Sequence, residues 1–236
     1  MTMTTKDDRP VPGRHNMYHA IHRGLRLGHA RLLERIGATD FADPTAAAAT
    51  VAAVREFLAL ARGHLDSEET FIHPAVEARD PSATAHAHEG HEDHERAFDE
   101  LAGLLDAIAA APDAGRTAAG QALYARYARF AADDLHHMDG EETVLLGAMH
   151  RLFSDDELRG IEGRIVSAAD PAKMMGYLRL IVPAISPPER LGMLAAMRAA
   201  MPAAAFAAVM DGAVHATLAP EEAAAIAMAL AQPAAA

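Results

Sequence analysis

A seven-residue sequence occurs twice in this chain and indicates two helices that share one interior. The segments His64-Leu-Asp-Ser-Glu-Glu-Thr70 and His137-Met-Asp-Gly-Glu-Glu-Thr143 are nearly identical. In each copy, a histidine precedes a glutamate by four residues. On an α-helix this spacing places both side chains on one face, with Cβ atoms about 5–6 Å apart. The repeat therefore predicts two helices that each present an imidazole and a carboxylate to a common site.

Four long stretches carry apolar residues at helical spacing before residue 154. They span about residues 15–37, 45–74 (or to 80 after a kink), 83–111 and 116–153. Alanine, leucine and methionine are abundant, and aromatic residues make up only 5% of the chain, a composition that favours helices. Four long helices joined by short polar turns predict an all-α, up-down-up-down four-helix bundle.

The last third of the chain has a different pattern, in which prolines recur at intervals typical of short helices. Because proline is well tolerated in the first turn of a helix, these breaks predict about five short helices, near residues 155–169, 172–184, 188–200, 203–216 and 220–231. We therefore expect a flexible N-terminus at 1–14, a bundle at 15–153 and a small helical domain at 154–236.

Histidine is concentrated in the predicted bundle, where thirteen of the fourteen histidines lie before residue 152. Several of them, with two glutamates, occupy positions that apolar residues would fill in an ordinary bundle. Burying such groups is costly unless they are paired or bind a metal. Six or seven ligands are too many for one tetrahedral zinc, but they suit two cations that share two carboxylates. The predicted ligands are His22, His64, Glu68, His91, His94, His137 and Glu141.

The spacing leaves alternatives open for some of these ligands. Glu95, His136 or His19 can each take the place of one member of the set. Glu69 and Glu142 are expected to face solvent or to accept a hydrogen bond from a ligand imidazole. The remaining histidines of the bundle are expected at the surface, at the solvated start of the third helix, or in support of a ligand: His29, His73, His86, His88 and His150.

The helices that carry these residues resemble the hemerythrin-like (HHE) cation-binding family. The resemblance covers about residues 15–153 and rests on His22, the two His-x-x-x-Glu pairs and His91-x-x-His94, with similar local sequence at 21–26, 69–74 and 92–96. It implies two non-haem iron ions, rather than zinc or manganese, bridged by Glu68 and Glu141. It also implies an open position for dioxygen, peroxide or nitric oxide.

Two positions depart from the oxygen-carrying members of that family. Their third helix has His-x-x-x-His, whereas His91 and His94 are three residues apart. Their fourth helix has His-x-x-x-x-Asp, which would correspond here to His136 and Glu141. Reversible oxygen carriage therefore does not follow from the resemblance.

Charge and composition restrict the remaining functions. A net charge of -12 argues against a nucleic-acid partner, and the absence of cysteine excludes disulfides and thiolate ligands. No uninterrupted apolar stretch of 18 residues and no signal-peptide pattern occurs, so we expect a cytoplasmic protein without a membrane span. No nucleophilic triad or phosphate-binding loop is present, which favours a metal-binding or sensor protein over a dedicated enzyme.

Two other functions remain open. The chain could be a di-iron peroxidase or oxidase. It could also be a regulatory module whose C-terminal helices read the metal state of the bundle, with an alanine- and methionine-rich surface that binds a protein partner or a second copy of the chain.

Overall fold

A computed structural model describes residues 9–232, except the side chains of residues 86, 89 and 113. All regular structure in this range is helical. Contacts divide the chain into two compact units, one formed by Met1–His19 and Gly28–Ala168 and the other by Ala20–Leu27 and Ala169–Ala236. The predicted all-α class, with a bundle followed by further short helices, is confirmed.

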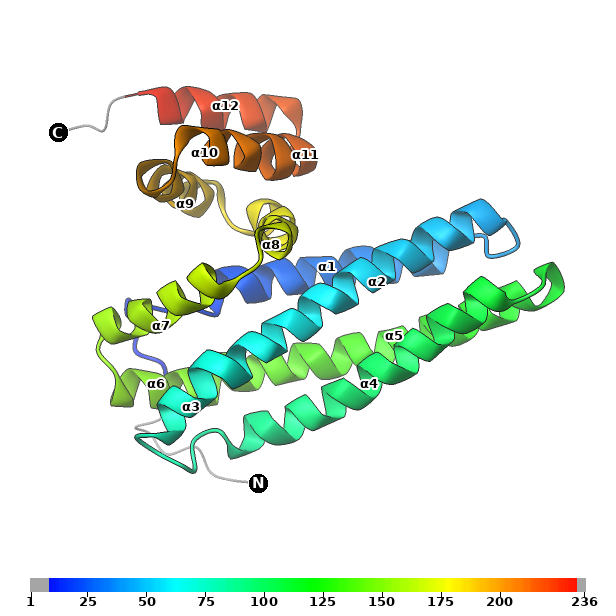
Figure 1. Ribbon diagram of the computed structural model, residues 1–236, viewed down its shortest axis with the longest axis horizontal. Helices are drawn as coiled ribbons and strands as arrows, with labels where there is room; N and C mark the ends of the chain where they lie inside the picture. The colour runs from blue at the N-terminus through cyan, green and yellow to red at the C-terminus, as the bar shows by residue number, and fades with distance from the viewer. Residues whose placement is uncertain (1–8, 233–236) are drawn as a thin grey trace. The chain divides into compact units, whose positions relative to one another are not determined.

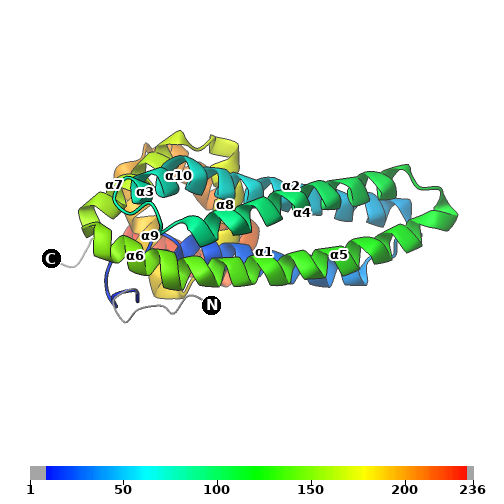
Figure 2. The same cartoon turned by 90° about the horizontal axis from the view of Figure 1, so that it is seen from below.

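Four long helical segments form the bundle, as Figures 1 and 2 show from two directions. The second and fourth segments are each interrupted by one turn of π-helix. In chain order, the elements are α1 (His19–Ala38); α2 (Pro44–Ser67), η1 (Glu68–Ile72) and α3 (His73–Glu77); α4 (Ala85–Ala110); and α5 (Asp113–Gly140), η2 (Glu141–Leu145) and α6 (Leu146–Leu152).

Local capping explains where these helices begin. The Asp43 side chain accepts a hydrogen bond from the Thr45 amide, and Pro44 occupies the first turn of α2, so that the helix starts at a favoured cap. Helix α1 begins four residues later than predicted, at His19. The reason is that Asn16 Oδ1 accepts hydrogen bonds from the amides of Tyr18 and His19, at 3.0 and 3.1 Å, as a capping side chain does.

Helix α7 (Asp155–Ala168) belongs to the bundle unit. Its residues Leu158 and Ile161 are buried in one cluster with Ile72, Val76 and Met149. The compact unit therefore extends beyond residue 153, where the change in local sequence suggested a boundary. Helix α7 packs as part of this unit because two large aliphatic side chains are buried against α6 and η1. Each burial stabilises the fold by about 1.5–3 kcal/mol.

Hydrogen bonds attach the start of the described chain to the end of α6. The Val11 amide donates to His150 Nδ1 at 2.9 Å. The Arg14 guanidinium donates to Asp155 Oδ1 at 2.9 Å and to the carbonyls of His150 and Phe153. Residues 9–14 of the segment predicted to be flexible are thus anchored, whereas residues 1–8 lie outside the described part.

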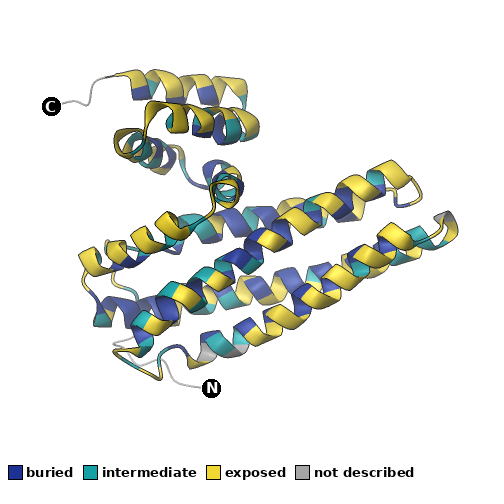
Figure 3. Ribbon diagram, in the orientation of Figure 1, coloured by how far each residue is buried: buried dark blue, intermediate teal, exposed yellow. Residues whose placement is uncertain are grey.

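The second unit contains four of the five predicted short helices, since the first of the five is α7. They are α8 (Pro171–Ala184), α9 (Pro187–Ala200), α10 (Ala203–Val209), η3 (Met210–Val214), α11 (His215–Thr217) and α12 (Pro220–Ala231). Their inward faces form a separate apolar core that includes Leu178, Val182, Leu194, Val214 and Ile226. Figure 3 shows buried inner faces and exposed outer faces along these helices.

One helical stretch, Pro44–Glu77, is long and apolar enough to cross a membrane by length and composition alone, with a mean hydropathy of 1.2. The core helix of a water-soluble bundle meets the same criterion. Here its buried residues, among them Val54, Phe57 and Leu65, pack inside the bundle, so this feature is weak support for a membrane span.

Candidate metal centre

Both copies of the repeat change helical geometry at their first glutamate. Glu68 begins η1 and Glu141 begins η2. Near each of these turns, a threonine hydroxyl donates to the carbonyl four residues earlier: Thr70 to Asp66 and Thr143 to Asp139, both at 2.6 Å. Single π-turns are frequent at functional sites, and these hydroxyls give the threonine of each repeat a structural role. Periodicity alone does not reveal such turns.

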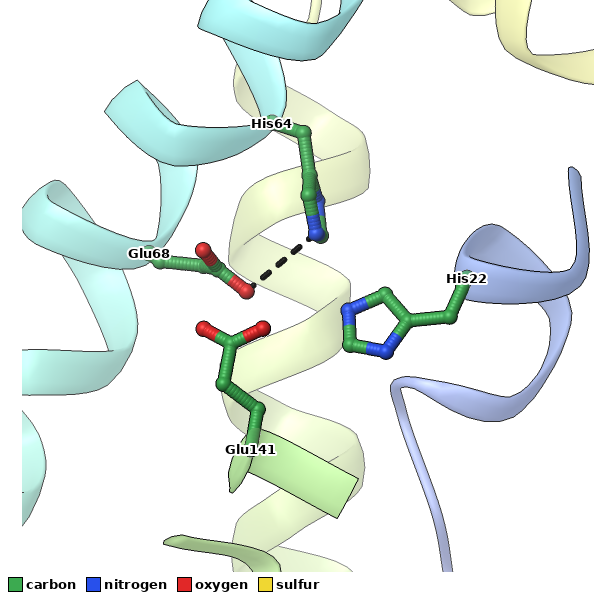
Figure 4. A group of neighbouring side chains, drawn as sticks. All are labelled: His22, His64, Glu68 and Glu141. Carbon is green, nitrogen blue, oxygen red and sulfur yellow. Dashed lines mark ion pairs between the residues drawn. The ribbon is translucent and has the colours of Figure 1, made fainter. Parts of the chain in front are cut away.

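Two groups of potential ligands share both glutamates. The first contains His22, His64, Glu68 and Glu141, and the second contains Glu68, His91, His137 and Glu141. Within each group, the ligand atoms all lie within 4.8 Å of one another. Figure 4 shows the first group, in which side chains from α1, α2, η1 and η2 point toward one another.

Six of the seven predicted ligands are therefore brought together, and the seventh, His94, lies in neither group. Since Glu68 and Glu141 are the members common to both groups, their positions suit carboxylates that bridge two cations.

Distances between the side chains fit two coordination spheres. His64 Nε2 lies 3.3 Å from Glu68 Oε1, and His137 Nε2 lies 3.3 Å from Glu141 Oε1. His91 Nε2 is 3.4 Å from Glu68 Oε2 and 3.8 Å from Glu141 Oε1. Two ligands that are each about 2.1 Å from one ion lie about 3.0–3.5 Å apart at octahedral or tetrahedral angles. Three of these four separations match ligands around common ions, and the fourth, between His91 and Glu141, is longer at 3.8 Å.

The negative charges of the two buried carboxylates also favour a bound cation. Glu68 and Glu141 are only 1% and 2% exposed. Burial raises the pKa of Glu68 well above its usual value, and the neighbouring Glu141 carboxylate raises it further. Neither carboxylate oxygen of Glu68 accepts a hydrogen bond from the described residues. Two adjacent buried carboxylates are stable as anions only beside compensating positive charge.

His91 carries that positive charge when no metal is bound. Burial lowers the pKa of His91, but interactions with Glu141, Glu68 and Glu69 outweigh it and raise the pKa to about 10. Because a metal ligand must be a neutral imidazole, metal binding would release this proton. The residues present therefore fit a cation better than they fit the metal-free state.

Glu69 orients His91 toward the two carboxylates. Glu69 Oε1 lies 2.6 Å from His91 Nδ1, which leaves Nε2 directed at Glu68 and Glu141. Such a carboxylate on the far nitrogen of a ligand imidazole fixes its tautomer and its orientation. Glu69 therefore has one of its two expected roles, that of an acceptor from the imidazole of a candidate ligand.

His94 is part of a separate buried network. Its Nε2 lies 2.9 Å from Asp134 Oδ1 and its Nδ1 lies 2.7 Å from the Gly90 carbonyl. Asp134 Oδ2 also contacts His29 Nε2 at 2.7 Å, and His29 Nδ1 contacts the Tyr127 hydroxyl at 3.1 Å. Both nitrogens of His94 are therefore engaged away from the two ligand groups. Asp134 was not among the predicted site residues, although it lies three residues before His137 on the same face of α5.

The three alternative ligands also lie in neither group. Glu95 is half-exposed and pairs with Arg62 at 3.1 Å. His136 is exposed and His19 is half-buried. His29, His73 and His150, which were expected at the surface or in support of a ligand, are buried, at 1%, 1% and 6% exposure.

Gly90 allows α4 to approach the ring of His137. A Cβ atom at this position would lie 2.6 Å from His137 Nδ1, closer than van der Waals contact permits. A small cavity of about 20 Å³ lies beside the same ring, lined by Ala83, Ala87, His137, Gly140, Glu141, Val144 and Leu145. Its volume suits one water-sized molecule.

The fold and this site define an all-helical protein with a buried centre of histidines and carboxylates. The family model of the hemerythrin HHE cation-binding domain matches residues 15–149. The chain therefore belongs to the hemerythrin HHE cation-binding family. Searches of curated proteins and of solved structures gave no significant match.

Proposed function

We propose that the chain binds two iron ions and uses them to bind or sense dioxygen, peroxide or nitric oxide, or to handle iron. His22 and His64 would hold one ion, and His91 and His137 the other. Glu68 and Glu141 would bridge the two. The observation that supports this most strongly is that both glutamates belong to both ligand groups. Bound iron would supply a redox-active centre with an exchangeable coordination position.

The side chains around the centre control charge and access. Glu69 holds the His91 ring in place through its 2.6 Å contact. Tyr18 is 1% exposed; burial raises its pKa well above the ordinary value, and the charges of Glu141 and Glu68 raise it further. The phenol therefore keeps its proton beside the carboxylates and can act as a hydrogen-bond donor near a bound ligand.

The size of the cavity beside His137 supports a small ligand. A volume of about 20 Å³ accommodates a molecule the size of water. Organic substrates are far larger, since their sites typically have volumes of about 300–1,000 Å³. This cavity therefore suits a diatomic molecule or peroxide and not an organic substrate.

The test is the metal content of full-length protein purified from iron-replete cells. Two irons per chain are expected, with oxo-bridged charge-transfer bands in the near ultraviolet after anaerobic loading and exposure to oxygen. Glu68→Ala should lose both ions together, whereas His136→Ala, at an exposed position outside both groups, should retain them. One zinc per chain would overturn the proposal, and loss of one ion in Glu68→Ala would show that this carboxylate does not bridge.

A further inference from the structure

A second cluster of ligand side chains lies beside the centre but uses none of its six residues. It consists of Glu69, His73 and His88, whose ligand atoms all lie within 4.8 Å of one another. Glu69 directly follows Glu68, so on the helix its side chain points in a different direction. His73 lies one turn further along the same helical segment, and His88 lies in the first turns of α4.

The three side chains converge on one carboxylate oxygen. Glu69 Oε1 lies 3.1 Å from His88 Nδ1 and 3.4 Å from His73 Nδ1. The rings of His73 and His88 meet edge to face with centroids 4.7 Å apart. These separations are those of ligands around a single ion, as in the dinuclear groups.

His73 is the side chain that most needs a partner. It is only 1% exposed, and neither of its ring nitrogens makes a hydrogen bond within residues 9–232. Burying an imidazole in this way is costly, since buried polar atoms are nearly always satisfied. Its Nδ1 is directed toward Glu69, where a cation would supply the missing interaction.

His88 is already held in the orientation that a ligand requires. Its Nε2 contacts Glu77 Oε1 at 2.6 Å, and the Thr84 hydroxyl donates to the same oxygen at 2.7 Å. Nδ1 is thereby turned toward Glu69. A carboxylate on one nitrogen of an imidazole whose other nitrogen faces a metal is a common supporting arrangement.

The cluster can be reached from solvent. The side chains of Glu69 and His88 are 39% and 41% exposed. Both line an open groove of about 650 Å³, together with Leu65, Asp66, His91, Glu92, Glu95 and Arg96. Four carboxylates against one guanidinium give this groove a negative potential, which attracts cations.

We propose that Glu69, His73 and His88 bind one divalent transition-metal cation beside the dinuclear centre, as a third metal site of the chain. Two imidazoles and one carboxylate suit zinc, iron(II) or manganese(II) and leave positions for water. The site adjoins the centre through Glu69, which also contacts His91. It does not require the dinuclear centre to be filled.

Equilibrium dialysis of metal-stripped full-length protein against Zn²⁺ alone, followed by elemental analysis, tests the site. The wild-type protein should bind three ions per chain, and His88→Ala and His88→Gln should each bind two. His88 is half-exposed, so neither change opens a cavity in the core. Circular dichroism checks the fold, and His136→Ala should retain three ions. Equal stoichiometry in the wild type and in both variants would overturn the third site.

Glu68→Gln separates this inference from the proposed function, because it should lose the two ions of the dinuclear centre and keep one. If the wild type bound a single ion that His88→Ala lost and Glu68→Gln kept, the third site would stand and the dinuclear proposal would fail. If the wild type bound two ions and His88→Ala also bound two, the dinuclear proposal would stand and the third site would fail.

Discussion

Asp134 Oδ1 lies 2.9 Å from His94 Nε2, and this contact engages a histidine that the sequence assigned to the metal. Asp134 contacts His29 through its other oxygen and is 6% exposed. One carboxylate thus joins α1, α4 and α5 inside the bundle. Its role is to stabilise the helices that carry the centre.

Asp134→Asn should destabilise the metal-free protein by about 3 kcal/mol, because removal of one partner from a buried ionic network leaves the others uncompensated. Urea unfolding at pH 7 measures the change. Asp133→Asn is the matched control, since Asp133 is the preceding residue on α5 and is exposed. Equal stability of the two variants would show that the network contributes nothing.

The contribution of Asp134 should disappear in acid. Burial raises its pKa, but the hydrogen bonds with His29 and His94 outweigh burial and hold the pKa well below the usual value. Stabilisation from such a group is complete above the unfolded pKa of about 3.9 and is lost as pH falls toward the folded pKa. The difference in unfolding free energy between wild type and Asp134→Asn should therefore be constant from pH 5 to 6 and shrink below about pH 4. A difference that stayed unchanged at pH 3 would contradict this assignment.

Gly90→Ala should lower metal content, since the new Cβ would lie 2.6 Å from His137 Nδ1 and displace that ligand ring. Metal-binding titration should show loss or at least tenfold weakening of one ion or both. Gly103→Ala, on the same helix with nothing within 4 Å of the added Cβ, should retain both ions. It should also stabilise the helix by up to about 1 kcal/mol. Identical metal binding by the two variants would show that Gly90 is not needed at the site.

The helices and most residues of the candidate site could be predicted because their signals are local. Apolar spacing and proline positions determine where helices run, and a His-x-x-x-Glu pair lies on one face wherever the helix packs. The choice between His91 and His94 is different. Both lie on α4, and the rotation of that helix depends on how Gly90 fits against His137 and on the Asp134 network, which are tertiary contacts.

The boundary of the bundle could not be predicted for a related reason. The sequence of residues 155–168 resembles that of the short helices after it, but Leu158 and Ile161 are buried against residues of α6 and η1. Burial partners distant in sequence leave no trace in local composition. The π-turns at Glu68 and Glu141 were likewise invisible, because one wider turn scarcely alters helical periodicity.

The threonine hydroxyls within the π-turns should stabilise the two repeats equally. Thr70→Val and Thr143→Val each remove a 2.6 Å hydrogen bond to the carbonyl four residues earlier while conserving shape. Each should cost about 1 kcal/mol in thermal or urea unfolding. Thr217→Val, which removes a similar bond to the Ala213 carbonyl in the second unit, provides a reference away from the centre. If the first two variants lost metal without losing stability, the hydroxyls would act on the site rather than on the helix.

Glu68→Gln should stabilise the metal-free protein while abolishing binding of both ions at the dinuclear centre. Burial and the neighbouring Glu141 raise the pKa of Glu68, so its ionised form is unfavourable in the folded state. A carboxyl with a raised pKa gives full relative stability below its unfolded pKa of about 4.3, and that stability is lost as pH rises through the folded pKa. The amide of the Glu68→Gln variant does not ionise, so its stability does not fall in this way as pH rises. The unfolding free energy of the variant should therefore exceed that of the metal-free wild type by about 1–3 kcal/mol at pH 7 and equal it near pH 4.

Glu56→Gln, at an exposed position on α2, is the control and should change neither the stability of the metal-free protein nor metal binding. Metal should reverse the order at pH 7, because the filled centre stabilises only the wild type by mass action. A Glu68→Gln protein less stable than the metal-free wild type at pH 7 would mean that the pairing of Glu68 with His64 and His91 outweighs the cost of burying its charge. The carboxylate would then not need a cation.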